Sequence, residues 1–205
     1  MVPTQLNKIA EFLKTNPYNL SQPLQDGRLN SSVNEEEILN TIKGNFPIQL
    51  PKAREWWDFS FEENKIFYPV NIKTTTTKTA DNLNGKLGIY YALCSLLPEF
   101  NNEIAWEKYF QKLHKDLGTN TDRDYYFLII NKNDPKDVFI NSLKGIQTLQ
   151  PNNLPFQCKW DNNRKIVQRS FIESKNFILS ALAKSVTLRA NIYLAFKEVF
   201  GEFFE

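Results

Sequence analysis

The sequence predicts a mixed α/β fold in which helices cover both faces of one β-sheet. Apolar residues at helical spacing and short β-branched or aromatic runs follow each other in the order helix, strand, strand, helix, strand, helix. The chain has 205 residues, enough to bury a substantial core, and 14% of them are aromatic. We therefore expect a single α/β domain.

Two helices are expected before the first strand. Apolar residues recur at helical spacing over 4–14, which predicts an amphipathic helix, and a connector containing Pro and Asn follows it. The second helix is predicted to begin at Glu35, with Ser32 or Asn34 as its N-cap.

Two β-rich runs are predicted to form the centre of the sheet. The runs 56–61 and 66–73 are rich in aromatic and β-branched residues, and residues 62–65 between them predict a tight turn. Residues 74–84 are polar and rich in threonine, so we expect a loop there.

Helices and strands alternate in the next part of the chain. The segment 87–97 is apolar nearly all round and predicts a buried helix, whereas 103–117 predicts a more amphipathic one. Residues 125–131 are the clearest buried strand, and 138–140 predicts another short strand.

The C-terminal third divides into an irregular segment and a helix. Residues 141–169 are polar and basic, and we expect them to be irregular except for one strand at 155–160. A long helix is predicted from Ser170 to the end, bent or broken near Gly201.

Composition excludes several function classes. The chain has seven glycines and neither of the glycine-rich phosphate-binding motifs, which argues against a nucleotide-binding fold. His114 is the only histidine, so a His-rich zinc site cannot form. Cys94 and Cys158 stand apart in the sequence and are typical of reduced thiols, which together with the lack of a transmembrane run predicts a cytoplasmic protein. The net charge of +2 is not by itself a nucleic-acid signature.

A carboxylate, an amide and an amine are predicted to meet in the central hairpin. Asp58 interrupts an aromatic run, where aspartate is unusual, and Asn71 and Lys73 share one face of the next strand. Carboxylate and amide oxygens bind hard cations, and a lysine can hold a phosphate or assist an attacking water. These residues predict a Mg²⁺-dependent phosphodiesterase site with Asp58 and Asn71 as metal ligands. The alternatives are a solvated strand-end aspartate and an edge-strand lysine.

Glu35 is a candidate for a further acid at this site. An asparagine at position 71 adds no negative charge, and Glu35 shares a helix face with the apolar residues Ile38 and Ile42. We therefore expect Glu35 to be a catalytic residue and metal ligand. The alternative is that Glu35 and its acidic neighbours favour the helix N-terminus through the helix dipole.

This pattern resembles the PD-(D/E)xK nuclease superfamily, and type II restriction endonucleases in particular. In that family an aspartate opens one core strand and (D/E)-x-Lys lies on the next, and Asp58 and Lys73 match those positions. Asn71 stands in place of the usual acid, and Trp57 in place of the proline that often precedes the aspartate. Several segments also resemble such enzymes in sequence, namely PVNIKTT, ADNLNGKLGIYYAL, YYFLIINKND and LQPNNLPFQCKW.

The resemblance implies a restriction-endonuclease-like core, a Mg²⁺ cofactor and cleavage of double-stranded DNA at a short specific site. It also implies a homodimer and a companion DNA methyltransferase that protects host DNA. Within the single domain 1–205, residues 1–30 would be the N-terminal helix and connector, and 31–131 the catalytic core. Residues 141–169 would recognise DNA, and 170–205 would form the helix with a dimer contact.

Polar and basic residues after the central hairpin are candidates for DNA contacts. Arg, Lys, Asn and Gln are the residue types that contact phosphates and read base edges in the major groove. The alternative is an ordinary solvated surface. The predicted DNA-binding residues are Lys78, Lys86, Asn153, Gln157, Lys159, Asn162, Asn163, Arg164, Lys165 and Arg169.

Three rival readings follow from the same sequence. The first is a DNA repair or junction-resolving nuclease on the same core. The second is a DNA-binding module whose catalytic site has decayed, with Asn71 as the sign of that decay. The third is an α/β protein unrelated to nucleic acid, which the small net charge favours.

Overall fold

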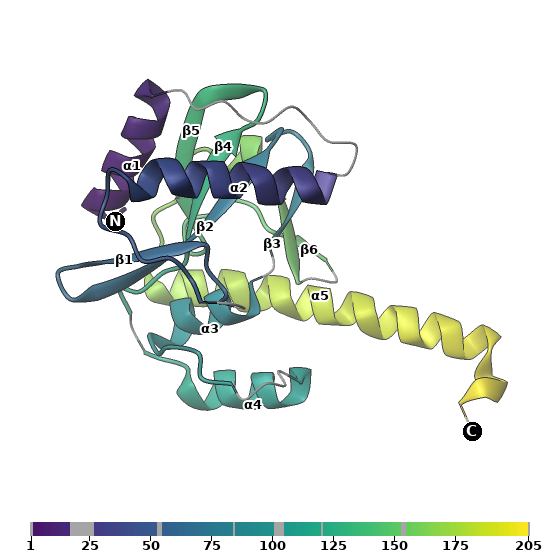
Figure 1. Cartoon of the computed structure of the whole chain (residues 1–205). Coiled ribbons are helices and arrows are strands. Elements are labelled where there is room, and N and C mark those ends of the chain that lie inside the picture. Colours follow the sequence, from purple (N-terminus) through teal and green to yellow (C-terminus); the bar gives the residue numbers. More distant parts are fainter. Residues whose placement is uncertain are drawn as a thin grey trace.

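The computed structural model describes residues 2–16, 27–52, 55–83, 85–100, 105–119, 121–152 and 155–204, with the backbone alone for 27–34. In these residues a four-stranded sheet and a three-stranded sheet lie among five α-helices (Figure 1). The prediction of a mixed α/β fold, with a sheet of mixed strand orientation flanked by helices, is confirmed.

The four-stranded sheet has the order β1-β2-β4-β5. Its strands are β1 (Phe59–Glu63), β2 (Ile66–Thr75), β4 (Tyr126–Asn131) and β5 (Asp134–Ser142). Strand β2 is parallel to β4, while the β1·β2 and β4·β5 pairs are antiparallel. The sheet is therefore of mixed orientation, with one parallel pair between two antiparallel pairs.

The central hairpin has the predicted position and a two-residue turn. Asn64 and Lys65 have φ values of 54° and 63°, the left-handed conformation that tight hairpin turns use. Strand β1 begins three residues later than predicted, at Phe59, and its register with β2 ends at the Phe59–Val70 pair. The C-terminal half of β2 therefore extends past the end of β1.

Two apolar cores cover the two faces of this sheet. Helices α1 (Thr4–Thr15) and α2 (Gly27–Lys43) pack on one face, where Ile38 and Ile42 of α2 contact Val70 and Ile72. Because side chains alternate along a strand, Asn71 and Lys73 of β2 lie on the opposite face. Phe127 and Ile129, which are their register partners on β4, belong to the second core.

Helices α3 (Lys86–Cys94), α4 (Trp106–Asp116) and α5 (Phe171–Val199) supply the second core. Helix α5 begins at a capping box formed by Ser170 and Glu173. It ends at Val199 and the 3₁₀ turn η2 (Gly201–Phe203) follows, so the predicted long helix and its break near Gly201 are confirmed. Figure 1 shows the C-terminal half of α5 projecting beyond the rest of the molecule. No helix in the described part of the chain is both long and apolar enough to span a membrane.

The three-stranded sheet was not predicted from the sequence, although its central strand was, at 155–160. Its order is β3-β7-β6, with β3 (Ala80–Leu83), β7 (Phe156–Lys159) and β6 (Gln150–Pro151), and the 3₁₀ turn η1 (Trp160–Asn163) follows β7. The expectation of a loop over 74–84 was wrong, because β2 continues to Thr75 and β3 follows. A four-residue strand has little signal of its own, and the partner that stabilises β3 lies more than 70 residues away.

The predicted start of the second helix was also wrong. Helix α2 begins at Gly27, so Glu35 lies in its interior and neither Ser32 nor Asn34 is an N-cap. Serine and asparagine lower helix propensity without stopping a helix, and a run of them resembled a cap. The explanation of Glu35 through the helix dipole is therefore excluded, since that effect is confined to the first turn.

Candidate active site

Asp58 completes the β-ladder at the point where β1 stops pairing with β2. Its backbone N–H donates to the Val70 carbonyl at 2.9 Å, and its Oδ2 accepts from the Ile72 N–H at 2.6 Å. The same Oδ2 accepts from Asn71 Nδ2 at 2.7 Å. The carboxylate is thus fixed beside the open edge of β2, and among the described residues these hydrogen bonds all fall on Oδ2, which leaves Oδ1 for another ligand.

Lys73 extends from β2 toward the small sheet. Its Nζ donates to the Asn82 carbonyl at 3.0 Å and lies 3.9 Å from Asp81 Oδ1. The side chain is only 19% exposed. Burial raises the pKa of Asp58 and of Glu35, and the positive charge of Lys73 opposes that rise. The structure therefore brings Asp58, Asn71 and Lys73 together, as the hairpin predicted.

Glu35 reaches the same cluster from α2. Its pKa is raised to about 7, first by burial and then by the negative charge of Asp58, while Lys73 opposes the shift and Asp81 adds to it. The groups that act on Glu35 come from β2, from β3 and from the residue before β1. The sequence prediction that Glu35 faces this site is in agreement with that electrostatic coupling.

Asp81 is a residue of the cluster that the sequence reading did not include. It lies on β3, its Oδ2 accepts from the indole Nε1 of Trp160 at 2.8 Å, and its Oδ1 faces Lys73. This residue was placed in the loop expected over 74–84 and was given no role at the site. The one available signal was the spacing of Asp81 and the buried Leu83. The two residues are two positions apart, so they share a face if the segment is a strand.

The cluster carries more negative than positive charge. Glu35, Asp58 and Asp81 surround one ammonium group, that of Lys73. Burial raises the pKa of Asp58, against the hydrogen bond from Ile72 and the charge of Lys73. Two carboxyl groups with raised pKa values beside a partly buried lysine are typical of a functional site.

The donor set is suited to a hard cation that retains water ligands. Within the described ranges, no three Asp, Glu, His or Cys side chains are grouped closely enough to form a ligand shell by themselves. Mg²⁺ is commonly bound through one or two carboxylates and keeps several waters. Asp58 and Glu35 supply two carboxylates, and a cation would relieve the repulsion that raises the pKa of Glu35.

The predicted DNA-binding residues fall into two groups in the structure. Lys78, Lys159, Asn162 and Lys165 are exposed, and Gln157 is partly exposed on the outer side of the small sheet, where Asn152 Nδ2 donates to its Oε1 at 3.3 Å. These five side chains remain candidates for nucleic-acid contacts. Asn153 lies outside the described residues.

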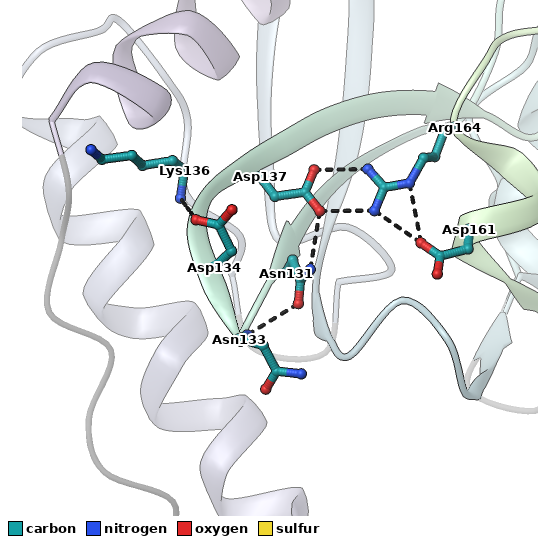
Figure 2. A network of polar contacts seen from close by, with 7 residues as sticks. All are labelled: Asn131, Asn133, Asp134, Lys136, Asp137, Asp161 and Arg164. Carbon is teal, nitrogen blue, oxygen red and sulfur yellow. Dashed lines mark hydrogen bonds and ion pairs between the residues drawn. The ribbon is translucent and has the colours of Figure 1, made fainter.

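Arg164 is held in an ion-pair network instead of extending freely into solvent. Its two terminal nitrogens each lie 2.8 Å from the oxygens of Asp137, and Nη2 and Nε lie 2.9 and 3.1 Å from Asp161 Oδ1 (Figure 2). Asn131 Nδ2 also donates to Asp137. The network fastens η1 to the β4·β5 hairpin, so Arg164 has a structural role that the sequence reading missed.

Three further residues of the predicted set have structural contacts. Asn163 is completely buried, and its side chain bonds to the backbone of Thr148, so it cannot contact DNA in this structure. Arg169 donates to two backbone carbonyls and stacks on Phe177. The Lys86 ammonium lies 3.6 Å from the ring centroid of Trp106. All three residue types are suited to DNA binding, but the burial and local contacts of Asn163 exclude a DNA contact by that residue.

Comparisons with known proteins give no independent assignment. No protein-family model matches this chain, and no curated protein matches it.

Proposed function

We propose that this chain is a type II restriction endonuclease of the PD-(D/E)xK superfamily, which hydrolyses double-stranded DNA at a short specific site with Mg²⁺. The observation that carries the proposal is the convergence of Asp58, Asn71 and Lys73 at the open edge of β2, with Glu35 coupled to them from α2. The mixed sheet, in which β2 forms an antiparallel hairpin with β1 and runs parallel to β4, is compatible with the implied core. A cytoplasmic location and a companion DNA methyltransferase belong to the same proposal.

Each residue of the cluster has a chemical role in this proposal. Asp58 binds the cation through Oδ1, because Oδ2 is engaged by the Ile72 N–H and by Asn71. Asn71 orients Asp58 by donating to it, and its own oxygen remains a neutral ligand. Bound Mg²⁺ supplies charge neutralisation at the phosphate and an acidified water.

Lys73 and Glu35 complete the set. The Lys73 ammonium contacts the scissile phosphate and stabilises the negative charge that develops in the transition state. Glu35 would hold a cation as a second carboxylate, because a nearby positive charge favours its ionised form. Two carboxylates and a lysine would then be available to the phosphate.

Digestion of DNA tests the proposed activity. Purified protein is incubated with plasmid and phage DNA of known sequence, with and without Mg²⁺, and the ends of the products are mapped. Discrete fragments with identical ends support a restriction endonuclease, whereas nicks at branched or mismatched DNA support a repair or junction nuclease. DNA binding without cleavage under any metal would show the decayed module, and neither binding nor cleavage would refute a nucleic-acid function.

The proposed double-strand cleavage implies that the chain pairs with a second copy of itself. Cutting both strands at one site needs two catalytic clusters, and the described residues contain a single such cluster. The projecting half of α5 offers a surface for the second copy, since large apolar side chains are exposed there. These are Val186, Leu188, Ile192, Tyr193, Leu194, Phe196 and Val199.

Analytical ultracentrifugation tests this pairing. We expect a dimer for the native chain and a monomer when Ile192 and Leu194 are replaced together by Glu. Asn176→Glu, at an exposed polar position in the N-terminal half of the same helix, is the matched control and should remain dimeric. A native monomer, or a double variant that stays dimeric, would exclude this surface without touching the hydrolytic proposal.

A further inference from the structure

We propose that Asp81 is a positioning residue for Lys73, held by Trp160, and that it restores at the site the negative charge that Asn71 lacks. The inference rests on the proposed function. It assigns a role to strand β3, which neither the sequence pattern nor the resemblance included in the site.

The contacts of Lys73 come from two adjacent residues of β3. The backbone carbonyl of Asn82 accepts a hydrogen bond from Lys73 Nζ at 3.0 Å, and Asp81 Oδ1 lies 3.9 Å from the same nitrogen. A lysine side chain has four rotatable carbon–carbon bonds and adopts many rotamers when nothing holds it. Two oxygens on one strand restrict the ammonium to the side of β2 where Asp58 and Asn71 lie.

Asp81 is itself held in place by a rigid group. Trp160 is completely buried, and its Nε1 donates to Asp81 Oδ2 at 2.8 Å. Asp81 also lies opposite the buried Cys158 in the antiparallel register of β3 and β7. One carboxylate oxygen is therefore fixed by the core of the small sheet, and the other faces the lysine. This arrangement resembles the support that precise catalytic groups need from neighbouring residues.

The charge of Asp81 acts on the whole cluster. It contributes to the raised pKa of Glu35, which also has Asp58 and Lys73 as charged neighbours. With Asn71 in the place of an acid, Glu35, Asp58 and Asp81 are the three carboxyl groups that set the charge around Lys73. Among the described residues Asp81 belongs to no group of three acids that could hold a metal, so its effect is exerted through its ion pair with Lys73.

The Asp81→Asn variant separates charge from structure. The asparagine oxygen can still accept the Trp160 N–H bond, so the variant removes the negative charge and leaves the anchor. We expect the cleavage rate constant at saturating DNA to fall about tenfold to a hundredfold, with DNA affinity unchanged or slightly tighter.

Two further variants complete the test. Asp122→Asn removes a charge from an exposed aspartate whose side chain is 70% accessible, and it should leave the rate unchanged. Asp81→Glu keeps the charge and should recover part of the rate. Equal rates for Asp81→Asn and the native chain would refute the positioning role, as would a loss of rate that only matches a loss of folded protein.

A measurement without catalysis separates this inference from the proposed function. In spectra of the protein with ¹³C-dimethylated lysines, the Lys73 signal (assigned through Lys73→Arg) should shift in Asp81→Asn and not in Asp122→Asn. An unshifted signal overturns the inference even if the native chain cleaves DNA. A shifted signal in a chain that cleaves no DNA would retain the Asp81–Lys73 relation and refute the nuclease.

Discussion

Two clusters of charged residues lie near the four-stranded sheet, and they are opposite in electrostatic character. In the Arg164 network, Arg164 lies between Asp137 and Asp161, and hydrogen bonds to Arg164 lower the pKa of Asp137. In the Asp58 cluster, three carboxyl groups share one lysine, and the pKa values of Glu35 and Asp58 are raised. We call the Arg164 network balanced because both of its carboxylates accept hydrogen bonds from Arg164, and the Asp58 cluster unbalanced because, among the described residues, Lys73 donates a hydrogen bond to none of its three carboxyl groups.

This difference is why we propose the Asp58 cluster, and not the Arg164 network, as the binding site. The balanced network joins η1 to β5 through hydrogen bonds that both of its carboxylates already accept from Arg164. In the unbalanced cluster, burial raises the pKa of Glu35 and of Asp58, and carboxyl groups with raised pKa values are typical of binding or catalytic sites. The sequence reading assigned Arg164 to DNA contact because residue type alone does not reveal whether a charge is already paired.

The largest expected effect comes from removing the lysine or the fixed carboxylate of the unbalanced cluster. Lys73→Ala and Asp58→Asn should each lower cleavage by about a hundredfold to ten-thousandfold, since both groups act on the reacting phosphate or its metal. Initial rates on plasmid DNA measure this. Asp137→Asn, the same change in the balanced network, should cleave at the native rate, and similar losses in Asp58→Asn and Asp137→Asn would erase the distinction between the clusters.

Asn71→Asp tests whether the unbalanced cluster accepts a cation. The new carboxylate would face Asp58 Oδ2, where a hydrogen bond of 2.7 Å now lies, so the two acids would repel each other. We expect a loss of about 1–3 kcal/mol in the free energy of unfolding without metal, recovered when Mg²⁺ is added. Thermal unfolding with EDTA and with Mg²⁺ measures it; a loss that Mg²⁺ does not restore would argue against a metal ligand at position 71.

Arg164→Ala should affect stability and leave catalysis intact. The change leaves Asp137, whose side chain is 23% exposed, without its bidentate partner. The network is partly exposed and screened by solvent, so we expect about 1–2 kcal/mol of destabilisation by urea unfolding. Cleavage per folded molecule should be unchanged. A weaker affinity for DNA with normal stability would instead restore Arg164 to the DNA-contacting surface.

Glu35→Gln should raise the free energy of unfolding at high pH, by less than Arg164→Ala lowers it. A glutamate whose pKa is raised to about 7 binds more protons when folded than when unfolded, so its contribution to stability falls as pH rises from about 4.5 to about 7. Glutamine has no such loss. The variant should therefore be more stable than the native chain at about pH 8 and similar at about pH 4, by on the order of 1 kcal/mol after allowing for solvent screening.

The same variant should lose cleavage activity, because it removes a proposed metal ligand. Glu36→Gln is the matched control: Glu36 is exposed on the same helix, and we expect neither effect. Calorimetry across this pH range and cleavage assays measure both properties. Loss of activity in Glu36→Gln with a fully active Glu35→Gln would show that the wrong acid was assigned to the site.

Local sequence signals were sufficient for much of the fold and for the centre of the site. The hairpin, the buried strand β4 and the long helix α5 each contain a periodic apolar pattern of useful length, so their positions were predictable. Asp58, Asn71 and Lys73 lie within 16 consecutive positions of one hairpin, and strand alternation alone placed Asn71 and Lys73 on one face. Contacts between distant segments had no such signal.

The sequence by itself therefore determined the class of fold and the grouping of Asp58, Asn71 and Lys73 on one hairpin, because both depend on short-range periodicity. Tertiary structure decided the rest. It placed Glu35 in the interior of α2, brought Asp81 to Lys73 through the pairing of β3 with β7, and enclosed Arg164 between two carboxylates. Charge balance and burial depend on neighbours that are distant in the chain, and no local pattern records which residues those will be.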